Sequence, residues 1–333
     1  MIDCAFAPAL AAVEAGAIPG AALGVVTADG AAHTRVVGAA ALLPSPEPLT
    51  AEHWFDLASL TKPIATTTMI LSLAEQGRLD LDRPLTDAIP DLRQYDLAAP
   101  ERALTFRDCL AHRTHLPAVW PIYTYGDDPA RLRAWILQRE WRAGPPVYSD
   151  INYLLLGIAV ERLTDAPLGA WPLGDGLAYR PAGPAVATEH CRWRGRVLRG
   201  EVHDENAAAL GGEAGHAGLF GTLAGVLGFA RGLLDGSTPP ATLAAIRTPA
   251  PGAASPWRTC GWERRFAGWP GGDGCSAETI GHTGFTGTGL WVDFDRGLAW
   301  TLLTNRVHPT RHGADAVFAL RPAVGEAVID AFG

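Results

Sequence analysis

The sequence predicts an α/β fold of the α+β class: an antiparallel sheet built from both termini and flanked by helices, with an all-helical domain inserted between its halves. Strand patterns occur near both ends of the 333-residue chain, at 21–38 and 257–304, and helical patterns fill the middle. We therefore expect a sheet domain of residues 1–78 and 250–333, a mostly α-helical domain of residues 79–249, and an active site between them.

The N-terminal region begins with a predicted helix over 6–16. Residues 21–27 and 33–38 have strand patterns, and Asp29-Gly30 between them is typical of a tight turn, so a β-hairpin is expected. Residues 60–76 are apolar almost throughout, which indicates a helix buried on all sides.

The middle of the chain has several helical stretches separated by long loops, and its end returns to strands. The expected helices are 105–111, 130–138, 152–163 and 223–234. The expected C-terminal elements are strands at 257–265, 288–294 and 298–304 and a closing helix at 314–331.

Composition excludes several classes of function. The net charge of −8 argues against nucleic acid as a partner, and no stretch of about 18 apolar residues predicts a membrane span. The five cysteines lie far apart and include no C-x-x-C pair, which argues against a disulfide framework or a structural metal site. The N-terminus has no signal-peptide pattern, so we expect a cytoplasmic protein.

The stretch Ala58-Ser59-Leu60-Thr61-Lys62-Pro63 contains the only lysine of a chain with 27 lysines and arginines together. An arginine cannot lose its proton in a protein, whereas a lysine amine can when its surroundings lower its pKa. We therefore expect Lys62 to be an uncharged amine in the resting protein, although a lone lysine could also have arisen by chance.

Pro63 indicates where the helix over 60–76 begins, because proline is tolerated in the first turn of a helix. Ser59 then lies at the N-terminus, beside unpaired backbone N–H groups, and Lys62 lies one turn further on the same face. A hydroxyl, an adjacent base and nearby N–H donors are the components of nucleophilic acyl transfer.

Two later segments carry further candidates. Tyr148-Ser149-Asp150 precedes an apolar helix, where Ser149 or Asp150 could instead be a plain helix cap. His282-Thr283-Gly284 opens a glycine-rich segment before a strand, which is either a hairpin turn or a place where a ligand approaches the strand closely.

In this order the three segments resemble the S-x-x-K, Y-x-N and K-T-G motifs of the serine β-lactamase and penicillin-binding-protein family, and most closely its class C-like branch, which includes esterases. The resemblance implies a β-lactamase/transpeptidase-like fold, with Ser59, Lys62 and Tyr148 as catalytic residues. It also implies an oxyanion hole made of the backbone N–H groups of Ser59 and Phe285.

The segments differ from the family motifs at two positions. Asp150 stands where the family has asparagine, and His282 stands where it has the lysine of K-T-G; both are expected to support catalysis. Since a histidine is mostly neutral at pH 7, we expect an uncharged ester or amide as substrate.

Other residues are candidates for binding the substrate. Thr283 and Gly284 belong to the third motif. Trp120, Tyr123 and Tyr125 share one loop and are either part of the core or a wall of the acyl pocket.

The expected function is that of a serine acyl hydrolase that forms a Ser59 acyl-enzyme on small esters or amides, without a metal or other cofactor. Either Lys62 or Tyr148 is the proton acceptor. The alternatives are a β-lactamase or D-Ala-D-Ala carboxypeptidase and, in another class, a catalytically quiet ligand-binding relative. The expected partner is a small acyl substrate, and the sequence carries no indication of an oligomeric state.

Overall fold

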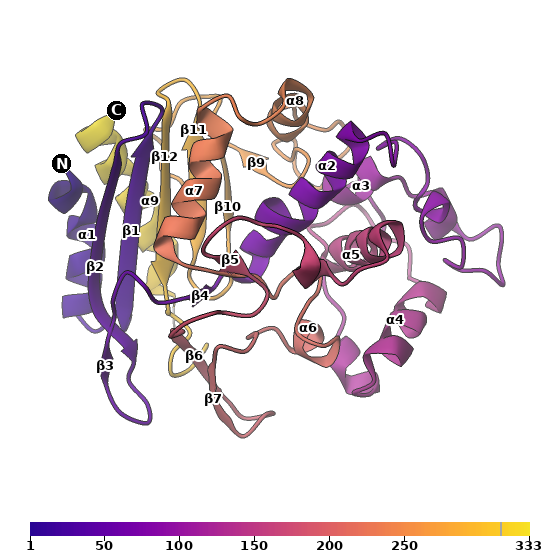
Figure 1. The fold of residues 1–333 in the computed structure, drawn as a ribbon, viewed down its shortest axis with the longest axis horizontal. Helices are drawn as coiled ribbons and strands as arrows, with labels where there is room; N and C mark the ends of the chain where they lie inside the picture. Colours follow the sequence, from indigo (N-terminus) through magenta and orange to yellow (C-terminus); the bar gives the residue numbers. More distant parts are fainter. Residues whose placement is uncertain (314) are drawn as a thin grey trace.

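The computed structural model describes residues 1–313 and 315–333 and has an antiparallel sheet in the half of the molecule where both termini lie (Figure 1). Within the described residues this sheet has seven strands. In spatial order they are β3 (Glu47–Pro48), β2 (Ala32–Ala41), β1 (Gly20–Thr27), β12 (Leu298–Thr304), β11 (Gly289–Asp293), β10 (Ile280–Thr283) and β9 (Glu263–Arg264). Because β1 pairs with β12, the two ends of the chain join in one sheet, which confirms the predicted fold class.

Helices cover both faces of the sheet. On one face α1 (Ile2–Glu14) packs against α9 (Ala316–Phe332), and together they cover β1, β2 and β12. On the other face α7 (Leu223–Leu234) contacts β1, β11 and β12. Helix α7 therefore lies on the sheet, although the expected boundaries place it within the helical residues 79–249. Position 314, where the closing helix was expected to begin, lies outside the described residues.

Strand β1 shows how the two layers are specified. Its alternate residues belong to two different apolar cores, Leu23 to the core with α1 and α9 and Val26 to the core with α7. Between them, a Cβ at Gly24 would lie 2.6 Å from Cδ1 of Leu227. The absence of a side chain at Gly24 is what allows α7 to lie directly on the strand.

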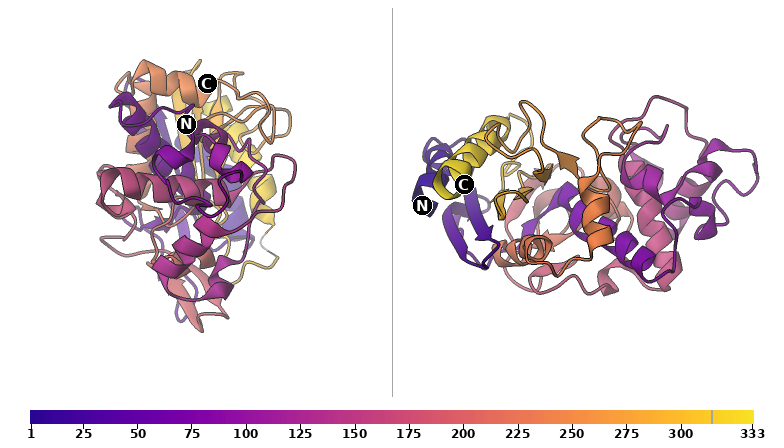
Figure 2. Two further views of the ribbon diagram at one scale, coloured as in Figure 1. Left: turned by 90° about the vertical axis from the view of Figure 1, so that its right-hand side faces the viewer. Right: turned by 90° about the horizontal axis from the view of Figure 1, so that it is seen from above.

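The helical side of the molecule lies beyond α7, at the end opposite the two termini (Figure 2). Its α-helices are α2 (Thr68–Glu75), α3 (Phe106–Leu110), α4 (Pro129–Gln138), α5 (Asp150–Thr164) and α6 (Glu205–Ala209). Its shorter helical turns are η3 (Leu85–Asp87), η4 (Pro100–Ala103), η5 (Ile122–Tyr125) and η6 (Leu168–Ala170). In the described part of the chain, no helix combines the length and apolarity needed to span a bilayer.

Several short elements were not predicted. They are β4 (Phe55–Asp56), β5 (Leu177–Ala178), β8 (Phe220–Gly221), the hairpin of β6 (Ala187–Cys191) and β7 (Arg196–Arg199), and α8 (Pro240–Arg247). Conversely, the strand expected over 257–265 is reduced to β9, because Gly261 has φ of +82° and the chain turns there.

The helix expected over 60–76 is present but is not α-helical throughout. It begins with a 3₁₀ turn, η1 (Ala58–Leu60), and continues as the π-helix η2 (Lys62–Thr67) before α2. Pro63 lies in the first turn of η2, where its missing N–H leaves no unmade hydrogen bond. The nucleophile predicted from sequence therefore lies at the start of the helical segment.

Candidate active site

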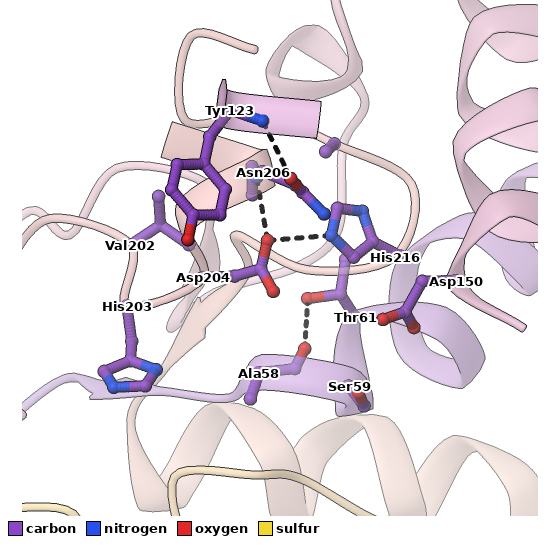
Figure 3. Close-up of polar contacts among 12 residues, drawn as sticks. Ala58, Ser59, Thr61, Tyr123, Asp150, Val202, His203, Asp204, Asn206 and His216 are labelled. Atoms are coloured by element: carbon purple, nitrogen blue, oxygen red, sulfur yellow. Dashed lines mark hydrogen bonds and ion pairs between the residues drawn. The ribbon is translucent and has the colours of Figure 1, made fainter. Parts of the chain in front are cut away.

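Ser59 lies in the turn that joins β4 to the buried helix. The preceding residue, Ala58, has φ of +48°, a left-handed conformation that costs about 1–3 kcal/mol in a residue other than glycine. Buried contacts hold this turn: the N–H of Ala58 donates to Asp56 (2.8 Å), and the hydroxyl of Thr61 donates to the carbonyl of Ala58 (2.7 Å; Figure 3). Burial raises the pKa of Asp56.

Lys62 has three oxygen atoms around its amine and no exposed surface. Its Nζ lies 3.0 Å from Oγ of Ser59, 3.1 Å from the carbonyl oxygen of His216 and 2.8 Å from Oδ1 of Asp150. An ammonium group has three N–H bonds and no acceptor, so three oxygen neighbours suit its charged form.

The electrostatics of Lys62 agree with this geometry. Burial alone would favour the neutral amine, but Asp150 and then Tyr148 outweigh it and raise the pKa of Lys62 to about 12. The expectation of an uncharged Lys62 is therefore wrong for the resting site. A planar guanidinium is larger than this three-oxygen site, which gives a physical reason for lysine here.

Asp150 is the first residue of α5, and Ser149 precedes it at the N-cap position. The Ser149 side chain does not cap the helix; its hydroxyl donates to the carbonyl of Pro117 at 2.6 Å. The N–H of Asp150 donates to the carbonyl of Ala118 at 2.8 Å. Both residues are thus fixed to the neighbouring loop, and the Asp150 carboxylate is placed beside Lys62.

Two cations lie close to the ring of Tyr148. Nζ of Lys62 is 5.0 Å from the centre of the tyrosine ring, and Cζ of Arg258 is 4.8 Å from it. The rings of His112 and His282 lie 4.5 Å and 5.9 Å away. These contacts place the Tyr148 ring against two positively charged side chains and two imidazole rings.

A cavity of about 340 Å³ opens beside these groups. It is lined by Ser59, Tyr148, Arg258, Glu263, Trp269, Pro270, Gly281, His282, Thr283, Gly284, Phe285, Trp291, Arg306, Phe318 and Arg321. The structure therefore brings the predicted nucleophile, Tyr148 and the third motif together around one space.

The third motif has a fixed backbone. The guanidinium of Arg321, on α9, donates to the carbonyls of Gly284 (2.7 Å) and Thr288 (2.8 Å). In a trans peptide the carbonyl and the following N–H point in opposite directions, so the N–H of Phe285 points away from Arg321. That N–H has no hydrogen-bond acceptor among residues 1–313 and 315–333, which is the geometry expected for an oxyanion donor.

His282 is buried at the end of β10. Its Nδ1 lies 3.0 Å from the carbonyl of Thr283, and since a carbonyl only accepts, Nδ1 carries the proton. Burial, and then the positive charges of Arg258 and Lys62, hold the pKa of His282 well below its usual range. His282 is therefore neutral, and its one N–H is already used within the protein.

A second group of polar contacts lies around His216 and Asp204 (Figure 3). Nε2 of His216 lies 2.9 Å from Oδ1 of Asp204, which also accepts from the N–H of Ala207 in α6 (2.8 Å). Although burial opposes its charge, His216 holds the pKa of Asp204 below its usual range. These contacts fix the position of His216, whose backbone carbonyl binds Lys62.

Comparison with known proteins decides the family. The model of the family described as Beta-lactamase matches residues 7–323 of the chain.

The chain belongs to the beta-lactamase family.

Its relatives in this family are hydrolases. The chain is 30% identical over 347 residues to an N-acetylmuramyl-L-alanine amidase of Bacillus subtilis, covering 88% of this chain and 78% of the relative. It is 27% identical over 318 residues to a putative D-alanyl-D-alanine carboxypeptidase of Salmonella agona, covering 80% and 72%. Among solved structures it is similar to the simvastatin synthase LovD of Aspergillus terreus, with a TM-score of 0.76, 19% identity and coverage of 99% and 98%.

These findings place the chain among the β-lactamase-like serine hydrolases. The likeness to the simvastatin synthase concerns the fold alone, and it confirms the β-lactamase/transpeptidase-like arrangement.

The structure does not bring the aromatic candidates of the 120–125 loop into the cavity of this family member. Tyr125 contacts Trp135, with ring centres 4.4 Å apart, and its hydroxyl oxygen accepts a hydrogen bond from the indole N–H of Trp120 (3.2 Å). The ring of Tyr123 contacts Trp193 at 4.9 Å. Within the described residues none of the three candidates lines the cavity, because each packs against other aromatic rings.

Sequence reasoning missed the charged lining of the cavity. Three guanidinium groups, from Arg258, Arg306 and Arg321, line it together with one carboxylate, from Glu263. Three positive charges against one negative leave the lining at +2, although the whole chain carries −8. Positive side chains therefore line the cavity although His282 itself is neutral, and the expected uncharged substrate stays a prediction.

Proposed function

We propose that this chain is a serine acyl hydrolase that forms an acyl-enzyme on Ser59 and acts on small amides or esters. The observation that carries this proposal is the Ser59–Lys62 pair. Its Oγ–Nζ distance is 3.0 Å, and the pair lies beside Tyr148 at the wall of the cavity. A hydroxyl, a fixed cation and a phenol around one space are the groups that acyl transfer requires.

In the first step Tyr148, as the phenolate, accepts the proton of the Ser59 hydroxyl while Oγ attacks the substrate carbonyl. Lys62 remains an ammonium ion, since its pKa is raised to about 12, and acts by positioning and by charge. The negative charge that forms on the carbonyl oxygen is stabilised by the N–H groups of Ser59 and Phe285. Tyr148 then returns the proton to the departing amine or alkoxide.

In the second step water takes the place of the leaving group. Tyr148 accepts a proton from this water, whose oxygen attacks the ester carbonyl of the acyl-enzyme. Collapse of the intermediate releases the acid and returns the proton to Ser59. One tyrosine thus serves both steps, which suits a site where Asp150 keeps Lys62 charged.

An amide is the favoured substrate within this proposal. One relative is named an amidase and another a putative carboxypeptidase, and both names describe hydrolysis of amide bonds. A departing amine needs a proton more than a phenolate does, and Tyr148 is placed to supply one. The carboxypeptidase relative also keeps a D-Ala-D-Ala carboxypeptidase as the second candidate function.

Intact-mass spectrometry after incubation with a fluorophosphonate probe tests the proposal. We expect a single adduct on the native protein and none on Ser59→Ala, which still folds because Ser59 is not part of the apolar core. A native protein that forms no adduct would favour the ligand-binding alternative. An adduct that survives Ser59→Ala would show that another residue is the nucleophile.

A further inference from the structure

Two buried threonine hydroxyls join the turn between β10 and β11 to the segment that carries Ser59. The hydroxyl of Thr286 donates to the carbonyl of Asp56 (2.7 Å), and the hydroxyl of Thr288 donates to the carbonyl of Leu57 (3.1 Å). Both threonines are buried. Their partners lie 230 and 231 positions away in the sequence, so these bonds connect two segments that only the fold brings together.

Each of the two peptides that precede Ala58 is held at both ends. Their carbonyls accept from the two threonine hydroxyls. The N–H of Leu57 donates to the carbonyl of Leu219 (2.9 Å), and the N–H of Ala58 donates to the Asp56 carboxylate (2.8 Å). A left-handed residue such as Ala58 persists only where its surroundings fix it, so these bonds also fix the position of Ser59.

The turn that presents Phe285 lies directly against the Ser59 segment. Inside this turn the N–H of Gly284 donates to the carbonyl of Thr288 (2.9 Å). A Cβ at Gly284 would lie 2.5 Å from the carbonyl oxygen of Leu57, so the glycine is what allows this close approach. The two N–H groups of the proposed oxyanion hole therefore belong to two segments in direct contact, which the threonine hydroxyls tie together.

We propose that Thr286 and Thr288 are positioning residues for the reaction: their hydroxyls set the distance between the N–H groups of Ser59 and Phe285. A tetrahedral oxyanion must accept from both N–H groups at once, at about 2.7–3.1 Å from each nitrogen, so the spacing of the two segments decides how well it is stabilised. This inference rests on the proposed function and adds to it two residues that do not touch the substrate.

The test removes the two hydroxyls and retains the branched shape of the side chains. Thr286→Val/Thr288→Val replaces each hydroxyl by a methyl group, whereas Thr286→Ser/Thr288→Ser keeps the hydroxyls. The valine variant should lower kcat for an aryl ester by about 10- to 100-fold and keep KM within about 2-fold, because a misplaced donor acts mainly on the transition state. The serine variant should keep kcat within about 3-fold of the native value.

Thr301→Val is the matched control. Thr301 is also buried, and its hydroxyl donates to the carbonyl of Gly289 (2.8 Å) between two strands of the sheet. This variant loses one buried hydroxyl bond, so its urea midpoint of unfolding should fall as it does in Thr286→Val, but its kcat should stay within about 2-fold of native. If the double valine variant does not fold, Thr286→Val alone is compared with this control.

Phenylboronic acid gives a readout that a merely structural role would not change. Its boron accepts Oγ of Ser59 and becomes a tetrahedral anion that resembles the transition state. The inhibition constant should therefore rise in the valine variant by about the same factor by which kcat falls, and it should stay at the native value in Thr301→Val.

Hydrogen exchange measured by mass spectrometry tests the same connection without a substrate. Amides of residues 55–60 should exchange at least about 5-fold faster in the valine variant than in the native protein, and at the native rate in Thr301→Val. A native kcat in the folded valine variant, or an equal loss of kcat in Thr301→Val, would overturn the proposal. If the native protein forms no fluorophosphonate adduct, the proposed function fails, and unchanged exchange at 55–60 would separately show that the hydroxyls do not position Ser59.

Discussion

The two cations near Tyr148, Lys62 and Arg258, are about equally close to its ring but differ in their surroundings. Lys62 has three oxygen atoms within 3.1 Å of its amine, whereas among the described residues Arg258 has a buried Nε without an acceptor and one ion-pair contact, at 3.4 Å. A cation whose contacts are complete within the protein has a fixed role there. A cation whose contacts are incomplete is suited to a ligand that completes them. The comparison thus separates a cation whose contacts are complete within the protein, Lys62, from one with an unused donor, Arg258.

The largest effect should come from removing the Ser59 hydroxyl, the proposed nucleophile. Ser59→Ala should lower kcat/KM for an aryl ester by at least about 10⁴-fold, because no acyl-enzyme can form. The free energy of unfolding, measured in urea, should change by less than about 1 kcal/mol. Turnover of the aryl ester by Ser59→Ala near the native level would show that Ser59 is not the nucleophile.

The contacts of Lys62 can be disrupted without removing its positive charge, by replacing it with arginine. Lys62→Arg should lower kcat by about 10³-fold, because a guanidinium does not fit between three oxygens in a site without exposed surface. Lys62→Met should also destabilise the fold by about 3 kcal/mol by leaving Asp150 unpaired, and adding Asp150→Asn should recover most of that loss. Native-like activity in Lys62→Arg would mean that charge alone matters at this position.

Arg321 differs from Arg258 in one respect: its Nη2 donates to two backbone carbonyls, although its Nε, like that of Arg258, has no acceptor among the described residues. Arg321→Gln should lower kcat by about 10- to 100-fold with little change in KM, since it loosens the peptide that orients the N–H of Phe285. Steady-state kinetics on 3-acetoxybenzamide separates the two constants. An effect confined to KM would show that Arg321 acts in substrate binding.

The neutral histidine next to Arg258 predicts a loss of stability in acid. The pKa of His282 is lowered in the folded protein, so the unfolded chain binds the proton more readily and stability falls as the pH drops below about 6.5. Between pH 6.5 and 5.5, His282→Gln should reduce this fall by about 1 kcal/mol per pH unit. Equal pH dependence in urea unfolding of both proteins would show that His282 is not held neutral.

The smallest effect concerns substrate preference and pH. Because His282 stays neutral down to pH 6, the ratio of kcat/KM for 3-acetoxybenzoate to that for 3-acetoxybenzamide should change by less than about 2-fold between pH 8 and pH 6. If the ratio rises as the pH is lowered from 8 to 6, a protonated His282 would be the group that binds the carboxylate.

Local sequence patterns predicted much of the fold. The hairpin of β1 and β2, the strand β12 and the helix α7 were expected from apolar periodicity, and the helical start at Ser59 from Pro63. Glycine conformation limited the C-terminal prediction, since the turn at Gly261 interrupts what otherwise alternates like a strand. The packing of α7 on the sheet could not be predicted, because it depends on contacts far apart in sequence.

The candidate site was predicted in its residues but not in its charges. The motif segments are local, whereas the protonation of Lys62 depends on Asp150, which lies 88 positions later in the chain (150 − 62). Arg258 is one of 26 arginines, the 27 basic residues less one lysine, and no spacing singles it out. Only the folded chain brings it to Tyr148.

The central claim is that Lys62 is an ammonium ion at rest, so that Tyr148 takes the proton. Because Lys62 is the only lysine, protein grown with ¹³C-labelled lysine gives a single Cε resonance whose shift reports its protonation. Asp150→Asn is the matched variant, and its resonance should titrate at lower pH than the native one. In the native protein we predict the ammonium shift throughout pH 6 to 9.5, in line with a pKa of about 12. A titration midpoint within that range would contradict the account.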